Sequence, residues 1–199
     1  VGSEMCIRDR KHTQDRVIIV SNFTSTLNLL QRYCVRQKFP FLRLDGRTKA
    51  DVRSKMVNEF NSDSGSDHLG KQPFVFLLSS KSGGVGLNLI GANRLILFDS
   101  DWNPATDRQA MARIHRDGQL KPCFIYRLLL VGSMDEKIYQ RQITKIGLSD
   151  SLMSNEAAKD HDVASSSDTF SQEELRDVFG YHPNTTCLTH DLLLSLIHI

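Results

Sequence analysis

Three side chains in one segment have the types and spacing that could act on a phosphate group. In QAMARIHRDGQ (109–119), Gln109, Arg113 and Arg116 follow one another at intervals of four and three residues, so a helix over 105–116 would present them on one face. A guanidinium fork binds phosphate oxygens bidentately and can stabilise charge on a transferring phosphoryl group. A solvated basic face of a surface helix would explain the same spacing, so both interpretations stay open on the residues alone.

A glycine-rich segment, SSKSGGVGLNL (79–89), is the second candidate. Its small residues would let the backbone approach a ligand closely, and Ser79, Ser80 and Lys81 offer donors suited to phosphate. A tight turn after a strand is the alternative. The dinucleotide-binding fingerprint fails because no third glycine follows Gly84 and Gly86 at the required spacing. The sequence also contains no G-x-x-x-x-G-K-S/T loop, so we expect that this chain alone does not hydrolyse ATP.

The other reactive residues form no recognisable constellation. Trp102, the only tryptophan, lies in DSDWNPATD (99–107). There it could meet a sugar-phosphate backbone or a base, or lie in the core. His115 has no nucleophile or carboxylate partner in a known pattern. Cys187 and His190 resemble half of a metal site, but no second pair accompanies them, and we predict no bound metal. The four scattered cysteines indicate a reducing intracellular compartment.

These segments would be positioned by strands that alternate with helices. Short apolar runs predict strands, and helical periodicity predicts helices between and after them. The expected strands are 17–20, 41–44, 74–78, 94–98 and 124–130; the expected helices are 24–37, 49–60, 105–116, 135–146 and 171–179. This alternation predicts an α/β fold with a parallel sheet covered on both faces. Functional side chains then belong in the loops at the carboxyl ends of the strands.

Charge is distributed unevenly along the 199 residues, although the net charge is only +2. The region 108–145 is rich in arginine and lysine, whereas 150–177 is rich in aspartate and glutamate. This asymmetry indicates a basic working surface followed by an acidic extension. No apolar run is long enough to cross a bilayer, so we expect no membrane span.

The chain divides by composition into four parts. Residues 1–9 and 194–199 resemble translated read-through of a sequencing adaptor and are expected to be artefacts. Residues 10–148 contain the alternating pattern and are expected to form one domain. Residues 149–193 form an acidic extension, in which 150–169 lack periodicity and are expected to be disordered or a linker.

Taken in order, the motifs resemble the carboxy-terminal helicase lobe of superfamily 2, in its SWI/SNF subgroup. The resemblance covers about residues 16–148 and rests on VIIVSNFTSTLNLL, RLDGRT, FLLSSKSGGVGLNLIGANRLILFDSDWNPATDRQAMARIHRDGQ and IYRLL. The segments RIHRDGQLKPCFIYRLL, DEKIYQRQITKIGLS and FSQEELRDVF are similar to the recombination-repair branch, most of all to its fungal mitotic-and-meiotic paralogue. The fold implied is a RecA-like lobe with a central parallel sheet flanked by helices, followed by a helical or disordered C-terminal extension.

The resemblance implies a role for each matching residue. Arg113 and Arg116 would be arginine fingers that reach ATP held by a first lobe. The residues implied to contact the nucleotide are Gly86, Asn88 and Gln109. The residues implied to contact DNA are Asn22, Gly46, Thr48, Ser79, Ser80, Lys81 and Trp102. The basic helix 135–146 would brace the lobe against its partner lobe.

The function implied is that of a double-stranded DNA translocase, an ATPase acting in homologous recombination and DNA repair in the nucleus. ATP with Mg²⁺ would be held mainly by the first lobe, which this sequence lacks. The implied partners are double-stranded DNA, a filament of the RecA-type recombinase and chromatin. Two alternatives remain: a lobe of a nucleosome remodeller, and a non-catalytic DNA-binding module.

Overall fold

The computed structural model describes residues 15–62, 72–82, 87–154, 172–183, 187 and 189. Its elements are β1 (Val17–Ser21), α2 (Thr24–Arg36), β2 (Phe41–Leu44), α3 (Ala50–Asn61), β3 (Val75–Ser79), β4 (Arg94–Leu97), α4 (Pro104–Met111), β5 (Phe124–Arg127), α5 (Met134–Ser154) and α6 (Gln172–Phe179). The artefact expected at 1–9 and the one expected at 194–199 lie outside the described residues. They therefore stay predictions.

The five strands form one parallel sheet in the order β2-β3-β1-β4-β5. β1 pairs on both sides, with Val17 opposite Val75 on one side and Arg94 on the other. All five residues of β3 are buried, as a strand covered on both faces requires. The α/β fold predicted from the alternating pattern is confirmed.

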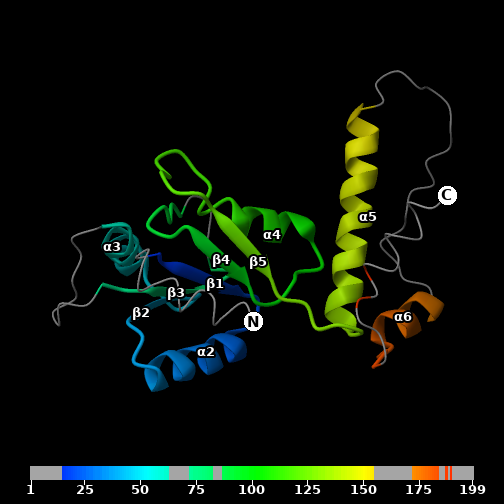
Figure 1. Ribbon diagram of the computed structural model, residues 1–199, viewed down its shortest axis with the longest axis horizontal. Helices are drawn as coiled ribbons and strands as arrows, with labels where there is room; N and C mark the ends of the chain where they lie inside the picture. The colour runs from blue at the N-terminus through cyan, green and yellow to red at the C-terminus, as the bar shows by residue number, and fades with distance from the viewer. Residues whose placement is uncertain are drawn as a thin grey trace. The chain divides into compact units, whose positions relative to one another are not determined.

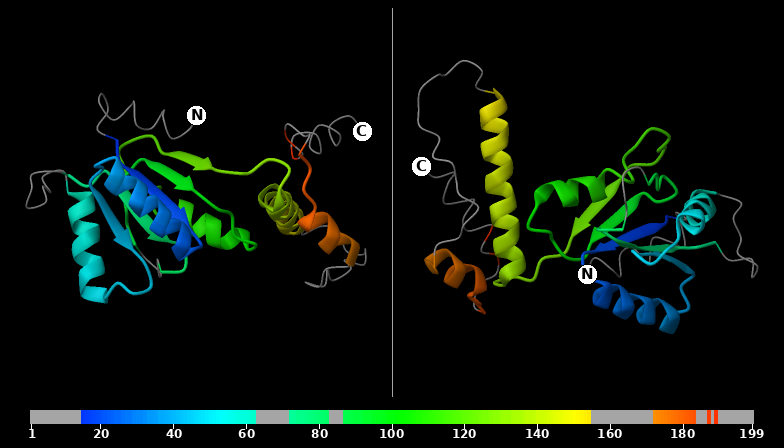
Figure 2. Two further views of the ribbon diagram at one scale, coloured as in Figure 1. Left: turned by 90° about the horizontal axis from the view of Figure 1, so that it is seen from below. Right: turned by 180° about the vertical axis from the view of Figure 1, so that it is seen from behind.

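Two apolar clusters cover the two faces of the sheet. Figure 1 shows α2, α3 and α4 around the sheet. On one face, Leu27 and Cys34 of α2 pack with Val17, Val75 and Leu77. On the other, α3 and α4 contribute Phe60 and Ala110, which pack with strand residues that alternate with the first set. The period of two along each strand thus divides one apolar run between two helix layers. A second view shows α2 and α3 beside the sheet (Figure 2).

Three elements end several residues away from the sequence prediction, whereas the others agree to within one residue at each end. The helix expected over 105–116 ends at Met111, and β5 ends at Arg127 instead of residue 130. In contrast, α5 continues to Ser154, into the segment 150–169 expected to be a linker. No proline interrupts 134–154, and Leu148 and Leu152 are four residues apart, so the local sequence permits the longer helix.

The helix after Pro104 ends early because the chain turns to bury Ile114. Arg113 and Ile114 donate their backbone N–H groups to carbonyls only three residues back, Ala110 O at 3.2 Å and Met111 O at 3.4 Å. Such bonds tighten the last turn of a helix. Ile114 is fully buried in the cluster beneath α4. The prediction of one continuous helical face through Arg116 is therefore wrong.

The chain divides into two compact units, and the second contains residues 102–104 and 129–199. In this unit Lys137 of α5 forms an ion pair with Asp177 of α6, with a nitrogen–oxygen distance of 3.0 Å. No helix among the described residues is long and apolar enough to cross a bilayer. The domain boundary expected at residue 148 stays a prediction.

Glu136 anchors the C-terminal segment of the second unit to α5. Its side chain is buried, and its two oxygens accept hydrogen bonds from Gly132 N at 2.8 Å and Thr189 N at 2.7 Å. Cys187 Sγ lies 3.5 Å from Glu136 Oε1. Burial alone would raise the pKa of this carboxyl, but the hydrogen bonds outweigh it and hold the pKa below its ordinary value.

Replacing Glu136 with glutamine is expected to loosen the C-terminal segment. The amide nitrogen of glutamine cannot accept, so one buried backbone N–H loses its partner, at a cost of about 1–3 kcal/mol. Because the folded pKa of Glu136 is depressed, its stabilisation is complete above the ordinary value of 4.5 and is lost as pH falls through the folded pKa. Urea unfolding across that range should show a weaker acid dependence in Glu136→Gln. The control Asp135→Asn should keep the wild-type profile, and a parallel change in both variants would contradict the assignment.

Candidate functional site

The loops after β1, β3 and β4 are joined at the carboxyl edge of the sheet by a polar network. Ser21 Oγ donates to Asp99 Oδ2, and Asn22 N donates to Asp99 Oδ1 at 2.7 Å. Ser80 Oγ donates to Asn22 Oδ1, and Ser80 N donates to Ser21 O at 3.1 Å. Two residues that the family resemblance implied to contact DNA, Asn22 and Ser80, are therefore in direct contact.

A second link connects the loop after β2 to the loop after β3. Thr48 closes the turn at Asp45: its N–H donates to Asp45 O at 3.1 Å, and its hydroxyl accepts from Asp45 N at 3.2 Å. Arg53 of α3 donates to Thr48 O at 2.8 Å and to Ser82 O at 3.0 Å. Gly46 faces the same loop, since a Cβ built on it would lie 3.7 Å from Ser82 Oγ. The turn containing Gly46 and Thr48 therefore lies next to the segment that contains Lys81.

The remaining residues implied to contact DNA lie in different environments. Lys81 is exposed, whereas Ser79 is buried at the end of β3, opposite Ser21. The side chain of Ser79 is therefore packed inside the sheet edge. Trp102 is exposed and belongs to the second compact unit.

Asn88 and Arg116, implied for the nucleotide and for catalysis, line one hollow together with Asp117. Asn88 Oδ1 is buried and accepts no hydrogen bond from any described residue. A buried acceptor of this kind calls for a donor from elsewhere, such as a ligand. Gly86, implied for the same site, lies outside the described residues.

Arg113 is buried in the protein interior. Its residue is 7% exposed, and its backbone carbonyl accepts a hydrogen bond from Leu89 N at 3.1 Å, so it is tied to the segment that carries Asn88. Burial lowers the pKa of the guanidinium, and the charge of Arg116 lowers it further. Arg116, in contrast, is exposed. The two arginines are close enough to repel but differ in environment, and Gln109 is exposed on α4.

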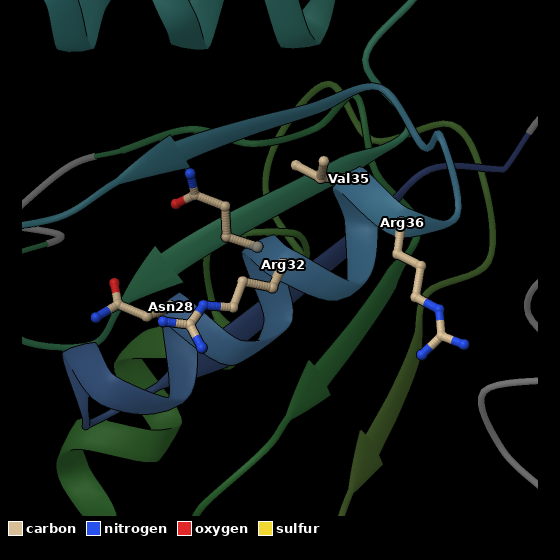
Figure 3. A pocket seen from close by; sticks show the side chains of 5 residues that line it. Asn28, Arg32, Val35 and Arg36 are labelled. Carbon is tan, nitrogen blue, oxygen red and sulfur yellow. The ribbon is translucent and has the colours of Figure 1, made fainter.

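Two further hollows lie elsewhere on the described surface. One adjoins Arg116 and runs along the segment 115–123. The other lies on the outer side of α2 and is lined by Asn28, Gln31, Arg32, Val35 and Arg36 (Figure 3). These five residues include no nucleophile and no carboxylate, so that hollow lacks the groups for acid–base or covalent catalysis.

Asp99 and Arg53 hold loops at the carboxyl edge of the sheet, and neither role was predicted from the sequence. Asp99 stands at the start of the DSDWNP segment, and Arg53 lies within an otherwise ordinary helical pattern. Their partners are 77 and 29 residues away in the chain. Spacing within a motif gives no signal for such contacts.

Asp99→Ala is expected to destabilise the first unit. It removes the acceptor for Asn22 N and for the buried Ser21 hydroxyl, which should cost about 1–3 kcal/mol. Asp99→Asn keeps one oxygen for Asn22 N and presents a donor to Ser21 Oγ, which can accept. This variant should therefore recover most of the loss. Urea unfolding measures both, and equal destabilisation by the two variants would contradict the network.

Comparisons with known proteins identify the fold. The sequence model of the family described as "Helicase conserved C-terminal domain" matches residues 3–118. The solved C-terminal part of the Fun30 ATPase domain is 36% identical with a TM-score of 0.62, covering 71% of this chain and 44% of that one. The RecA-like lobe implied by the motifs is confirmed.

The chain is also similar to curated DNA repair and recombination proteins. The DNA repair and recombination protein RDH54 of Saccharomyces cerevisiae is 48% identical over 94% of this chain and 19% of its own length. RAD54B of Homo sapiens is 50% identical over 90% of this chain and 18% of its own. This chain thus spans about a fifth of the length of the curated relatives it matches. The chain belongs to the helicase C-terminal domain family and is similar to SWI/SNF-type DNA repair and recombination proteins.

Proposed function

We propose that this chain is the second motor lobe of an ATP-dependent double-stranded DNA translocase that acts in homologous recombination and DNA repair. One observation carries the proposal: Asn88 and Arg116 line the same hollow, and the backbone of Arg113 is bonded to the segment that holds Asn88. A nucleotide seated there would meet a polar amide and a guanidinium together. The chain alone is proposed to be inactive, because its sequence contains no phosphate-binding P-loop.

The residues present fit a triphosphate held from the opposite side by a first lobe. ATP with Mg²⁺ would supply the phosphoryl group and the hydrolysis energy when bound, and the first lobe would hold most of it. Asn88 Oδ1 needs a donor, which a ribose hydroxyl or an amino group can supply. Arg116 is exposed and able to reach outward, and its charge would stabilise the phosphoryl oxygens in the transition state.

The DNA-facing part is proposed to be the three loops after β2, β3 and β1. These strands are neighbours in the sheet, so their loops form a continuous polar edge that carries Thr48, Ser80, Lys81 and Asn22. Backbone N–H groups, hydroxyls and a lysine suit phosphate oxygens and read no base sequence. Because Ser79 is buried, its proposed contribution is limited to its backbone. Alternate gripping by two such lobes would convert opening and closing into stepping along DNA.

The biological setting is proposed from the relatives, which are DNA repair and recombination proteins. It comprises the nucleus, a RecA-type recombinase filament as partner and chromatin as a further substrate. A nucleosome remodeller is the second candidate, because the SWI/SNF subgroup that the motifs resemble also contains remodellers. Binding to recombinase filaments and not to histones would separate the two.

Arg116→Ala is expected to abolish ATP turnover in this chain joined to a first motor lobe. Loss of an arginine finger lowers turnover by about a thousandfold or more. DNA affinity should stay within about twofold, since Arg116 lies at the nucleotide hollow. Duplex-stimulated ATP hydrolysis measures turnover, and fluorescence anisotropy measures DNA affinity. Arg108→Ala, at an exposed arginine of α4, is the matched control, and equal loss of binding and turnover would sink the assignment.

Lys81→Ala is expected to weaken duplex binding by the same amount for every DNA sequence. Loss of one phosphate contact should reduce the slope of log affinity against log salt by about one. The control is Lys55→Ala, at an exposed lysine within α3, which should leave the slope unchanged. An unchanged slope for Lys81→Ala in a salt titration would remove this lysine from the DNA surface.

A further inference from the structure

The carboxamide of Asn61 bridges both ends of the segment 88–91, which carries Asn88. Asn61 Nδ2 donates to Asn88 O at 2.8 Å, and Asn61 Oδ1 accepts from Gly91 N at 2.9 Å. A planar amide that donates at one end and accepts at the other fixes the separation of its two partners. Asn61, the last residue of α3, is 27 residues away from Asn88 in the chain.

The end of α3 is itself firmly held. Phe60 is fully buried, and its ring packs edge-on against Phe76 with centroids 5.0 Å apart. Arg16 donates to the carbonyl of Phe60 and, at 3.1 Å, to that of Ser62. The residues on either side of Asn61 are thus bonded to the same buried guanidinium. The backbone on both sides of Asn61 is therefore held in place.

The segment 88–91 lies directly against the end of α3. A Cβ built on Gly91 would lie 2.3 Å from Phe60 O and 2.9 Å from Asn61 Cα, distances that no side chain tolerates. Only glycine permits such an approach. The hydrogen bonds of Asn61 therefore join two stretches of backbone already at their closest approach.

A second carboxamide, that of Gln119, bonds to the segment and to Ala92 after it. Gln119 Nε2 donates to Ala92 O at 2.8 Å and to Ile90 O at 3.2 Å. It also lies 3.2 Å from Ile114 O, in the turn that follows α4. Together with the bond from Leu89 N to Arg113 O, these contacts tie the segment to the turn that carries both arginines. The segment therefore lies between α3 and the arginine turn.

We propose that Asn61 is a positioning residue of the hollow proposed for the nucleotide. Asn61 sets the position of Asn88 relative to Arg113 and Arg116. This inference rests on the proposed function. Asn61 contacts Asn88 only through its backbone carbonyl, so it acts through Asn88 and is not itself a catalytic residue. The DNA-facing loops are held by Asp99 and Arg53 instead. A substitution at Asn61 should therefore weaken ATP binding and leave DNA binding unchanged.

Asn61→Asp tests this with little change in shape. The carboxylate still accepts from Gly91 N, but it cannot donate to Asn88 O and places negative charge against that carbonyl. In this chain joined to a first motor lobe, the KM for ATP should rise by about tenfold or more. Asn61→Ala, which removes both bonds without adding charge, should raise the KM in the same direction. Duplex affinity should stay within about twofold in both variants.

Asn58→Asp is the matched control, because it makes the same change at an exposed asparagine one turn earlier in α3. ATPase kinetics, duplex affinity and thermal unfolding are measured for the wild type and all three variants. A raised KM in both Asn61 variants, with wild-type duplex affinity and a wild-type Asn58→Asp, supports the proposal. Asn61 variants that match Asn58→Asp overturn it, as does a parallel loss of DNA affinity and turnover. Failure of both Asn61 variants to fold also overturns it, because Asn61 would then be a residue of global stability.

The wild-type joined protein separates this inference from the function on which it rests. If the wild type shows no duplex-stimulated ATP hydrolysis, the proposed function fails and the inference fails with it. If the wild type is active and the Asn61 variants are unaffected, only the inference fails.

Discussion

The parallel direction of all five strands is the constraint on which the rest of this lobe depends. Each strand must be followed by a crossover before the next can run the same way, so every strand begins at one edge and ends at the other. The order β2-β3-β1-β4-β5 then decides which loops become neighbours. Loops from three adjacent strands form the polar edge proposed for DNA. The chain beyond β3 and α4 forms the hollow proposed for the nucleotide.

Within that frame, single polar side chains connect loops that lie far apart in sequence. Asp99 holds the loop after β1, Arg53 connects the turn at Thr48 to Ser82, and Asn61 and Gln119 bond to the segment 88–92. Each uses a carboxylate, guanidinium or carboxamide to satisfy backbone groups that strands and helices leave open. A loop needs such partners because buried backbone donors and acceptors are costly when unpaired. Hydrogen bonds from these four side chains therefore hold the described parts of the loops in place.

The sequence predicts the sheet well because its strands are short and rich in apolar residues, as in VIIV of β1 and VFLL of β3, and this is a local property. It fails at the end of α4, where burial of Ile114 overrides helical periodicity and separates Arg113 from Arg116 in environment. It also misses Asp99, Arg53 and Asn61, whose partners are brought close only by tertiary folding. The family motifs assign Asn88 and Arg116 to the nucleotide site, and both residues line one hollow. Their contact with a nucleotide stays a prediction, and the motifs do not show what holds the two residues in place.

Arg113 and Arg116 differ in burial, and this difference affects how they could act together on a phosphate group. Arg113 is buried, and burial together with the charge of Arg116 lowers its pKa. Even so, a guanidinium remains protonated at neutral pH, so the pair keeps two positive charges in close proximity. A like charge nearby disfavours the charged form of a guanidinium. Under the proposed function, negative charge that develops on phosphoryl oxygens would offset part of this repulsion. A buried arginine next to an exposed one would then suit the stabilisation of developing negative charge better than the binding of a neutral ligand.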